Sequence, residues 1–111
     1  MLELKDFEAA YNKVQEVVLP TKLIKSDYFS EQTGNDVYLK PENMQLTGAY
    51  KIRGAYYKIS TLSEEEKAKG LITASAGNHA QGVALAAARQ GVKATIVMPP
   101  TTPLLKVNRT K

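Results

Sequence analysis

One candidate for covalent chemistry is Lys51, which lies in the segment Gln45–Gly54 near the expected start of a helix. An ammonium group in the first turn of a helix faces the positive end of the helix dipole, at a cost of about 0.3–1 kcal/mol. The same field favours the neutral amine, which is the form that attacks an aldehyde to give a Schiff base. Since most lysines near helix starts are simply exposed to solvent, position alone does not distinguish a nucleophile from a surface residue.

A second candidate site is the turn Ser-Ala-Gly-Asn-His at residues 75–79, between an expected strand and an expected helix. Such a turn offers unpaired backbone N–H groups and a positive dipole end, which together bind carboxylates or phosphates. Ligands also gather at the carboxyl ends of strands in open α/β sheets. The candidate binding residues are therefore Ser75, Ala76, Gly77, Asn78 and His79. Structural roles remain open for the same residues: a tight turn for the glycine, caps for the serine or asparagine, and packing for the histidine.

Several familiar catalytic motifs are missing. Gly77 and Gly82 have the spacing of the two P-loop glycines, but Val83 stands where that motif requires lysine. There is no G-x-G-x-x-G and no G-x-S-x-G. The chain has no cysteine and one histidine, which argues against a zinc site.

The elements that must position these residues follow from hydrophobic spacing. Apolar residues from Leu4 to Val18 recur at helical spacing and predict an amphipathic helix that Pro20 ends. Residues 25–36 are polar and carry the turn signal Gly-Asn before a short strand at residues 37–40. A second helix is predicted from Thr47 or Gly48 to about Leu62.

The second half of the chain predicts a strand–helix–strand unit. Ser63 opens a capping box and a short helix that stops at Gly70. A buried strand at residues 71–74, an alanine-rich helix ending at Gln90 before Gly91, and a strand at residues 93–98 follow. This unit should form a right-handed parallel crossover. Thr102-Pro103 predicts the start of a last helix. The fold class is therefore α/β, a parallel sheet with flanking helices.

Composition excludes several other classes of protein. The chain is 43% hydrophobic and 23% charged, as is ordinary for a globular domain. Its net charge is +4 and its pI about 9.3, but the basic residues are scattered and mixed with acidic ones, so we expect no nucleic-acid partner. No apolar run approaches membrane-spanning length and the N-terminus lacks a signal-peptide pattern, so we expect no membrane partner and a cytoplasmic location.

Two segments together resemble the threonine dehydratases (threonine ammonia-lyases). Residues 40–55, Lys-Pro-Glu-Asn-Met-Gln-Leu-Thr-Gly-Ala-Tyr-Lys-Ile-Arg-Gly-Ala, are similar to the cofactor-lysine segment of that family. Residues 73–83 are similar to its asparagine-containing substrate loop, and the resemblance continues through Val-Met-Pro at residues 97–99. It implies the type II fold of pyridoxal-phosphate enzymes (tryptophan synthase β-like), in which the cofactor lies between two α/β domains.

The resemblance also implies roles for individual residues. Lys51 would hold pyridoxal 5'-phosphate and remove the α-proton of an amino-acid substrate, and Asn78 would bind the phenolic oxygen of the cofactor ring. Residues 75–79 would bind the substrate carboxylate. Tyr50 fills a position usually held by phenylalanine beside the ring. The implied reaction is dehydration and deamination of L-threonine, and of L-serine as a further substrate.

Related activities fit the sequence less well. Serine racemases of this fold carry a second serine just before the loop glycine, where this chain has Ala76. Cysteine synthases use a different lysine segment and a threonine in the loop. The alternative to a lyase is a non-catalytic remnant or small ligand-binding domain with half an active site.

The resemblance covers only the early part of the family's pattern. Its glycine-rich phosphate loop and the residue facing the pyridine nitrogen would lie beyond Lys111. We therefore expect residues 1–111 to be the N-terminal portion of a truncated catalytic region, inactive alone, from a protein that is a homo-oligomer at full length.

Overall fold

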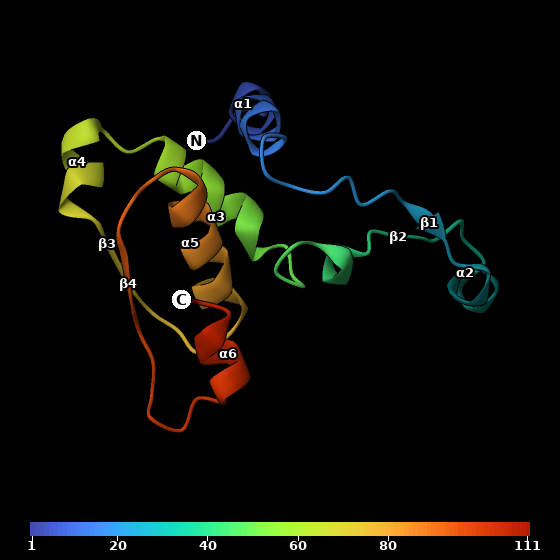
Figure 1. The fold of residues 1–111 in the computed structure, drawn as a ribbon. Helices are drawn as coiled ribbons and strands as arrows, with labels where there is room; N and C mark the ends of the chain where they lie inside the picture. Colours follow the sequence, from blue (N-terminus) through green and yellow to red (C-terminus); the bar gives the residue numbers. More distant parts are fainter.

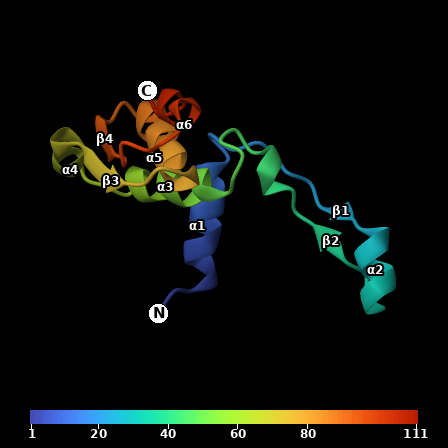
Figure 2. The ribbon, with the colours of Figure 1, turned by 90° about the horizontal axis from the view of Figure 1, so that it is seen from below.

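In the computed structural model, which describes residues 1–111, the chain forms an α/β body and an arm that projects from it (Figures 1 and 2). The arm consists of β1, α2 and β2, and the other elements form the body. In chain order the elements are α1 (Leu4–Val14), β1 (Ile24–Lys25), α2 (Asp27–Thr33), β2 (Tyr38–Leu39), a 3₁₀ helix (Glu42–Met44), α3 (Lys51–Ser60), α4 (Glu64–Lys69), β3 (Leu71–Ala74), α5 (Asn78–Arg89), β4 (Ala94–Val97) and α6 (Leu104–Asn108).

The strand–helix–strand unit confirms the α/β fold class. Strands β3 and β4 are parallel, with Leu71 opposite Ala94 and Ala74 opposite Val97, and α5 connects them. The prediction of a buried first strand is wrong, because Leu71 and Thr73 are only partly buried, and Ile72 and Ala74 are exposed, Ile72 to 77%. Alternate side chains point to opposite faces of a strand, and in this chain only one face is packed against helices.

The core lies where α3 and α5 pack against each other, side by side in Figure 1. Ile52 on α3 and Ala86 on α5 are both fully buried. Alanines on α5 keep the two helix backbones close, since a methyl group adds little bulk. The whole cluster contains nine buried residues: Val14, Val17, Val18, Ile52, Tyr56, Ile59, Ala86, Ala87 and Val92.

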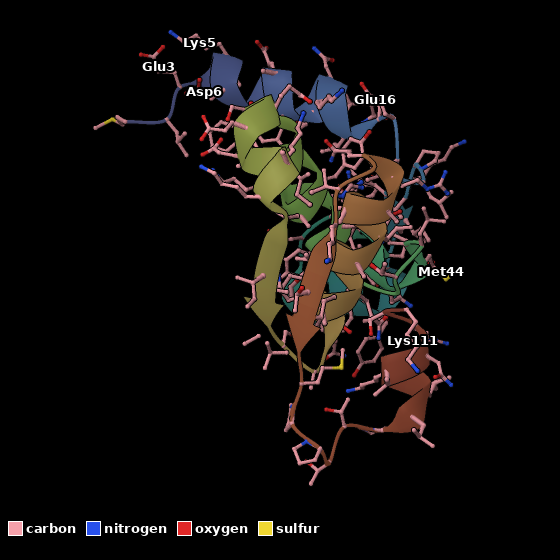
Figure 3. All side chains as sticks on the ribbon, turned by 60° about the vertical axis from the view of Figure 1, so that its left-hand side comes forward. Glu3, Lys5, Asp6, Glu16, Met44 and Lys111 are labelled. Atoms are coloured by element: carbon pink, nitrogen blue, oxygen red, sulfur yellow. The ribbon has the colours of Figure 1, made fainter.

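The N-terminal helix is shorter and more exposed than its pattern predicts. It ends at Val14, and a turn rather than a helix leads on toward Val18. Phe7 and Tyr11 are 59% and 62% exposed, because only the last turn of α1 and the residues after it reach the core. Figure 3 shows Glu3, Lys5 and Asp6 at the outer end of this helix. There, the Glu3 N–H donates to the Asp6 carboxylate at 2.8 Å, and the Asp6 N–H donates to the Glu3 carbonyl at 3.0 Å.

The arm contains two elements that the sequence pattern did not predict. The segment expected to be a polar loop includes α2, whose start is capped by the Ser26 hydroxyl, which accepts a hydrogen bond from the Phe29 N–H at 3.3 Å. Gly34 ends the helix with φ of 68°, a left-handed conformation that glycine adopts without strain. Strand β1 was also missed, and it pairs antiparallel with the predicted strand β2.

The remaining boundaries agree closely with the pattern. The Ser63 capping box and the Gly70 stop are confirmed around α4. Helix α3 begins at Lys51, later than predicted, because a turn with Gly48 at φ of 68° precedes it. Helix α6 begins at Leu104, directly after Pro103. None of the helices has both the length and the apolar character needed to cross a membrane.

Candidate functional site

Lys51 is the first residue of α3, and its side chain is exposed to solvent. Its amine makes no ion pair or hydrogen bond and lies 5.3 Å from the centre of the Tyr50 ring. The ring is itself 60% exposed. The first turn of the helix is closed by the Arg53 N–H, which donates to the Tyr50 carbonyl at 3.0 Å. The lysine amine is therefore free to react, on a backbone that is fixed by the helix.

The segment at residues 75–79 follows β3 and includes the first two residues of α5, Asn78 and His79. The Ser75 N–H donates to the Val97 carbonyl at 3.0 Å, which fixes the turn to the neighbouring strand. The Ser75 hydroxyl accepts hydrogen bonds from the N–H groups of Gly77 and Ala80, each at 3.3 Å. This hydroxyl therefore has the structural capping role that the sequence left open.

Backbone N–H groups in the same turn remain available for an anion. Those of Ala76, Asn78 and His79 make no hydrogen bond within the chain. They lie at the start of a helix of 12 residues, where the positive end of the dipole adds to the attraction. The side chains of Asn78 and His79 are exposed and make no hydrogen bond either. The turn can thus accept a carboxylate or a phosphate through its backbone.

Gly82 brings the two candidate segments together. This buried residue lies one turn into α5, and a Cβ atom placed on it would be 3.0 Å from the Lys51 carbonyl carbon. The same atom would be 3.2 Å from both the Lys51 Cβ and the Ile52 nitrogen. Helix α5 therefore touches the backbone of Lys51 through a residue without a side chain. The sequence pattern did not reveal this contact; the only available signal was a glycine inside an otherwise alanine-rich helix.

A cleft of about 450 Å³ opens beside the two helix starts. Three of the predicted site residues line it: Tyr50, Lys51 and His79. Its remaining walls come from α3, β3 and Val83. Residues 75–78 do not line this cleft. A separate cleft of about 610 Å³, on the α6 side of α5, contains none of the predicted residues.

An ion pair supports the helix that carries Lys51. The Arg53 guanidinium donates to both oxygens of the Glu42 carboxylate, at 2.9 and 2.8 Å. The hydroxyl of Thr21 donates to the same carboxylate, and the Lys40 amine donates to the Thr21 carbonyl at 2.8 Å. The hydrogen bond from Arg53 holds the pKa of Glu42 down at about 2, so the carboxylate stays ionised at every ordinary pH.

A buried amide supports the turn before Lys51. Gln45 is 4% exposed, and its side chain accepts from the Leu19 N–H at 2.8 Å and donates to the Leu19 carbonyl at 2.9 Å. The same oxygen accepts a longer bond from the Leu46 N–H at 3.3 Å. One side chain thus replaces a missing backbone partner for Leu19, and it ties the segment after α1 to the turn that leads into α3.

Comparisons with known proteins agree with this architecture. The chain is 54% identical over 111 residues to the L-threonine ammonia-lyase of Thermotoga maritima, a match that covers 100% of this chain and 28% of that protein. It is similar to a solved threonine deaminase, the processed form of isoform 2 from Solanum lycopersicum, with a TM-score of 0.82 and 40% identity over 98% of this chain and 31% of that one. It is also similar to a serine racemase from Dictyostelium discoideum, with a TM-score of 0.91 and 36% identity over 98% of this chain and 36% of that one.

The chain thus spans about a third of the length of these proteins. A family model described as pyridoxal-phosphate dependent enzyme matches residues 14–111, which include Lys51, the turn at residues 75–79 and Gly82. The chain therefore belongs to the family of pyridoxal-phosphate-dependent enzymes, and pyridoxal phosphate is its cofactor.

Proposed function

We propose that the protein containing this chain is a lyase that dehydrates and deaminates L-threonine, and L-serine as a second substrate. The substrate first loses its α-hydrogen and its β-hydroxyl, together one water. One water is then consumed by the hydrolysis that releases ammonia. The net products are 2-oxobutanoate and ammonia from threonine, or pyruvate and ammonia from serine. The single observation that carries the proposal is the contact of Gly82 with the Lys51 backbone, because it joins a reactive amine to an anion-binding turn.

The residues present fit pyridoxal phosphate. The Lys51 amine is exposed and makes no hydrogen bond or ion pair, so no other group of the chain competes for it. The adjoining cleft, at about 450 Å³, is within the usual size range for small-molecule sites. Tyr50 offers an aromatic face at the same place. When bound, the cofactor supplies an aldehyde for the amine and a ring that draws electrons away from the substrate α-carbon.

Lys51 is proposed to act twice. Its amine holds the cofactor before the substrate arrives, and afterwards it is free to remove the proton from the substrate α-carbon. A positioned base of this kind contributes about 10²–10⁴-fold to a rate. Because Lys51 is the first residue of α3, its main chain is held by the helix while its side chain keeps the reach that both tasks need.

The turn at residues 75–79 is proposed to hold the substrate carboxylate. The free N–H groups of Ala76, Asn78 and His79 can donate to it, and the Ser75 hydroxyl keeps the turn in shape. The Asn78 side chain would bind the cofactor ring oxygen. Fixing the carboxylate also fixes the direction of the α-hydrogen, and such orientation can lower a barrier by several kcal/mol, up to about 10.

Ala76 supports elimination rather than racemisation. A racemase needs a second acid–base group that reaches the opposite face of the substrate α-carbon. The side chain at position 76, just before Gly77, is a methyl group that cannot carry a proton. After Lys51 has removed the α-proton, position 76 therefore offers no group that could return a proton to the opposite face. Loss of the β-hydroxyl is then the favoured outcome.

The experiment is a product assay on the full-length protein loaded with pyridoxal phosphate. We expect 2-oxobutanoate and ammonia in equal amounts from L-threonine, and little D-threonine or D-serine. The Ala76→Ser variant is the matched test of residue 76, and it should raise the share of D-serine formed from L-serine. Absence of any 2-oxo acid, or a D-amino acid as the main wild-type product, contradicts the proposal. We expect residues 1–111 alone to give no turnover.

A further inference from the structure

We propose that Gly82 is a positioning residue for Lys51, because it sets how closely the anion-binding turn approaches the reactive amine. This inference rests on the proposed function, since it takes Lys51 as the reacting group. Gly82 lies four residues after Asn78 on the same helix, so its contact with α3 also fixes where the turn begins. Any side chain at position 82 would push the start of α3 away from the start of α5.

The distances leave no room for even one methyl group. A Cβ at position 82 would stand 3.0 Å from the Lys51 carbonyl carbon, 3.2 Å from the Ile52 nitrogen and 3.2 Å from the Lys51 Cβ. All three are backbone atoms or the first atom of a side chain, so none can swing away. Ordinary carbon–carbon contacts are about 3.5–4.0 Å, so α3 would have to shift by several tenths of an ångström.

The next turn of α5 shows that the close approach is local. Ala86 lies four residues further along the same face, and it is fully buried while carrying a Cβ. The helices therefore accommodate a methyl group at position 86 and none at position 82. The tightest constraint lies beside Lys51, whereas a requirement for close packing alone would apply along the whole interface.

A shift at Lys51 should act on the reaction step more than on substrate binding. The carboxylate would still bind to the N–H groups of the turn, which move with α5. The amine, which moves with α3, would reach the α-hydrogen from a wrong distance. A misplacement of about 1 Å can cost about 10²-fold in rate, so a shift of several tenths of an ångström predicts a loss of about tenfold in kcat.

The experiment compares Gly82→Ala with Ala86→Gly in the full-length protein loaded with pyridoxal phosphate. Ala86→Gly removes a buried methyl group from the same face of the helix and weakens packing without crowding Lys51. For Gly82→Ala we expect kcat for L-threonine to fall about tenfold, with KM changed less. The visible circular dichroism of the bound cofactor should also change, because the amine that holds it has moved. For Ala86→Gly we expect a lower Tm, with wild-type kcat and dichroism.

Other results of this experiment would overturn either the role of Gly82 or the proposed function. Wild-type kcat and dichroism in Gly82→Ala overturn the inference, as does an equal loss of both in Ala86→Gly. If Gly82→Ala does not fold, the double variant Gly82→Ala/Ala86→Gly, which loses a buried methyl group from the same face of α5, is measured in its place, and wild-type kcat and dichroism in that variant overturn the inference. A wild-type protein that never binds the cofactor through Lys51 overturns the proposed function itself, and this inference with it.

Discussion

The Arg53 guanidinium binds both oxygens of the Glu42 carboxylate, at 2.9 and 2.8 Å, and so joins the first turn of α3 to the 3₁₀ helix that precedes it. The two side chains are only 25% and 15% exposed. Arg53 lies two residues after Lys51, so the pair holds the helix start from the side opposite the reactive amine. Gly82 sets how closely α5 approaches the start of α3 on one side, and Glu42 holds that start on the other.

Removing one partner of this pair should destabilise the protein. Arg53→Ala leaves a carboxylate that is mostly buried without its main donor, and hydrogen bonds to charged groups contribute about 1.5–3 kcal/mol each. We expect a loss of about that size in the free energy of unfolding, measured by urea denaturation. Arg53→Lys keeps the charge but cannot bind both oxygens in parallel, so its loss should be smaller. Equal stability of all three proteins contradicts the assignment.

The same pair predicts a specific dependence of stability on pH. The pKa of Glu42 falls from its ordinary value of 4.5 to about 2 in the folded chain, chiefly because of the hydrogen bond from Arg53. Between these two values the unfolded chain binds more protons than the folded chain. The stability contributed by Glu42 is therefore complete above about pH 4.5 and is lost as the pH falls toward 2.

Glu42→Gln isolates this contribution. Glu16 and Glu66 also have lowered pKa values, because of hydrogen bonds from Lys13 and from the Ser63 N–H respectively. Both remain in the variant, so the difference between the two stability curves belongs to Glu42. We expect the variant to be less stable than the wild type at pH 6 and to lose less stability on acidification. Parallel curves would show that Glu42 has an ordinary pKa.

Gln45→Leu should destabilise the segment that leads into α3. The variant keeps a buried side chain of similar size but leaves the Leu19 N–H and carbonyl without their partner. Leu19 is 44% exposed, so water can replace the lost partner in part. Each lost hydrogen bond is worth about 0.5–1.5 kcal/mol, and we expect a loss of about 1–3 kcal/mol for the two together. Gln15→Leu is the matched control, because Gln15 is exposed and makes one long bond of 3.4 Å. A control that loses as much stability as Gln45→Leu argues against a special role for the buried amide.

Ser75→Ala should weaken substrate binding more than it slows the reaction. Its hydroxyl holds the N–H groups of Gly77 and Ala80, and a cap of this kind is worth about 1 kcal/mol. A looser turn binds the carboxylate less well and orients the α-hydrogen less firmly, so we expect KM for L-threonine to rise about fivefold to tenfold, with a smaller fall in kcat. Ser60→Ala removes a hydroxyl at the other end of α3 and should leave KM unchanged. A fall in kcat alone would contradict the proposed role of the turn.

The body of the fold could be predicted from sequence because its signals are local. The Ser63 capping box, the stop at Gly70 and the alternation of strands with an alanine-rich helix all lie within a few residues of the structure that they specify. The arm offered weaker signals. Helix α2 has no buried residue, so no apolar stripe marks it, and only Ser26 and Gly34 at its ends do so.

The site was predictable in its parts, and the relation between the parts was not. Lys51 and the turn at residues 75–79 lie in motifs that can be read along the chain. The contact of Gly82 with the Lys51 backbone depends on how α5 packs against α3, which no spacing along the chain reveals. The contacts of Gln45 with Leu19, 26 residues away, and of Glu42 with Thr21, 21 residues away, were missed for the same reason.

The central claim is that Lys51 is the amine that holds the cofactor, and reductive trapping tests it most directly. The full-length protein is incubated with pyridoxal phosphate, reduced with borohydride, digested, and analysed by mass spectrometry, with Lys51→Arg and the exposed surface variant Lys69→Arg alongside it. We predict a pyridoxyl group on Lys51 in the wild type and in Lys69→Arg, and no adduct or threonine turnover in Lys51→Arg. A stoichiometric adduct on another lysine, with turnover retained in Lys51→Arg, would contradict the account.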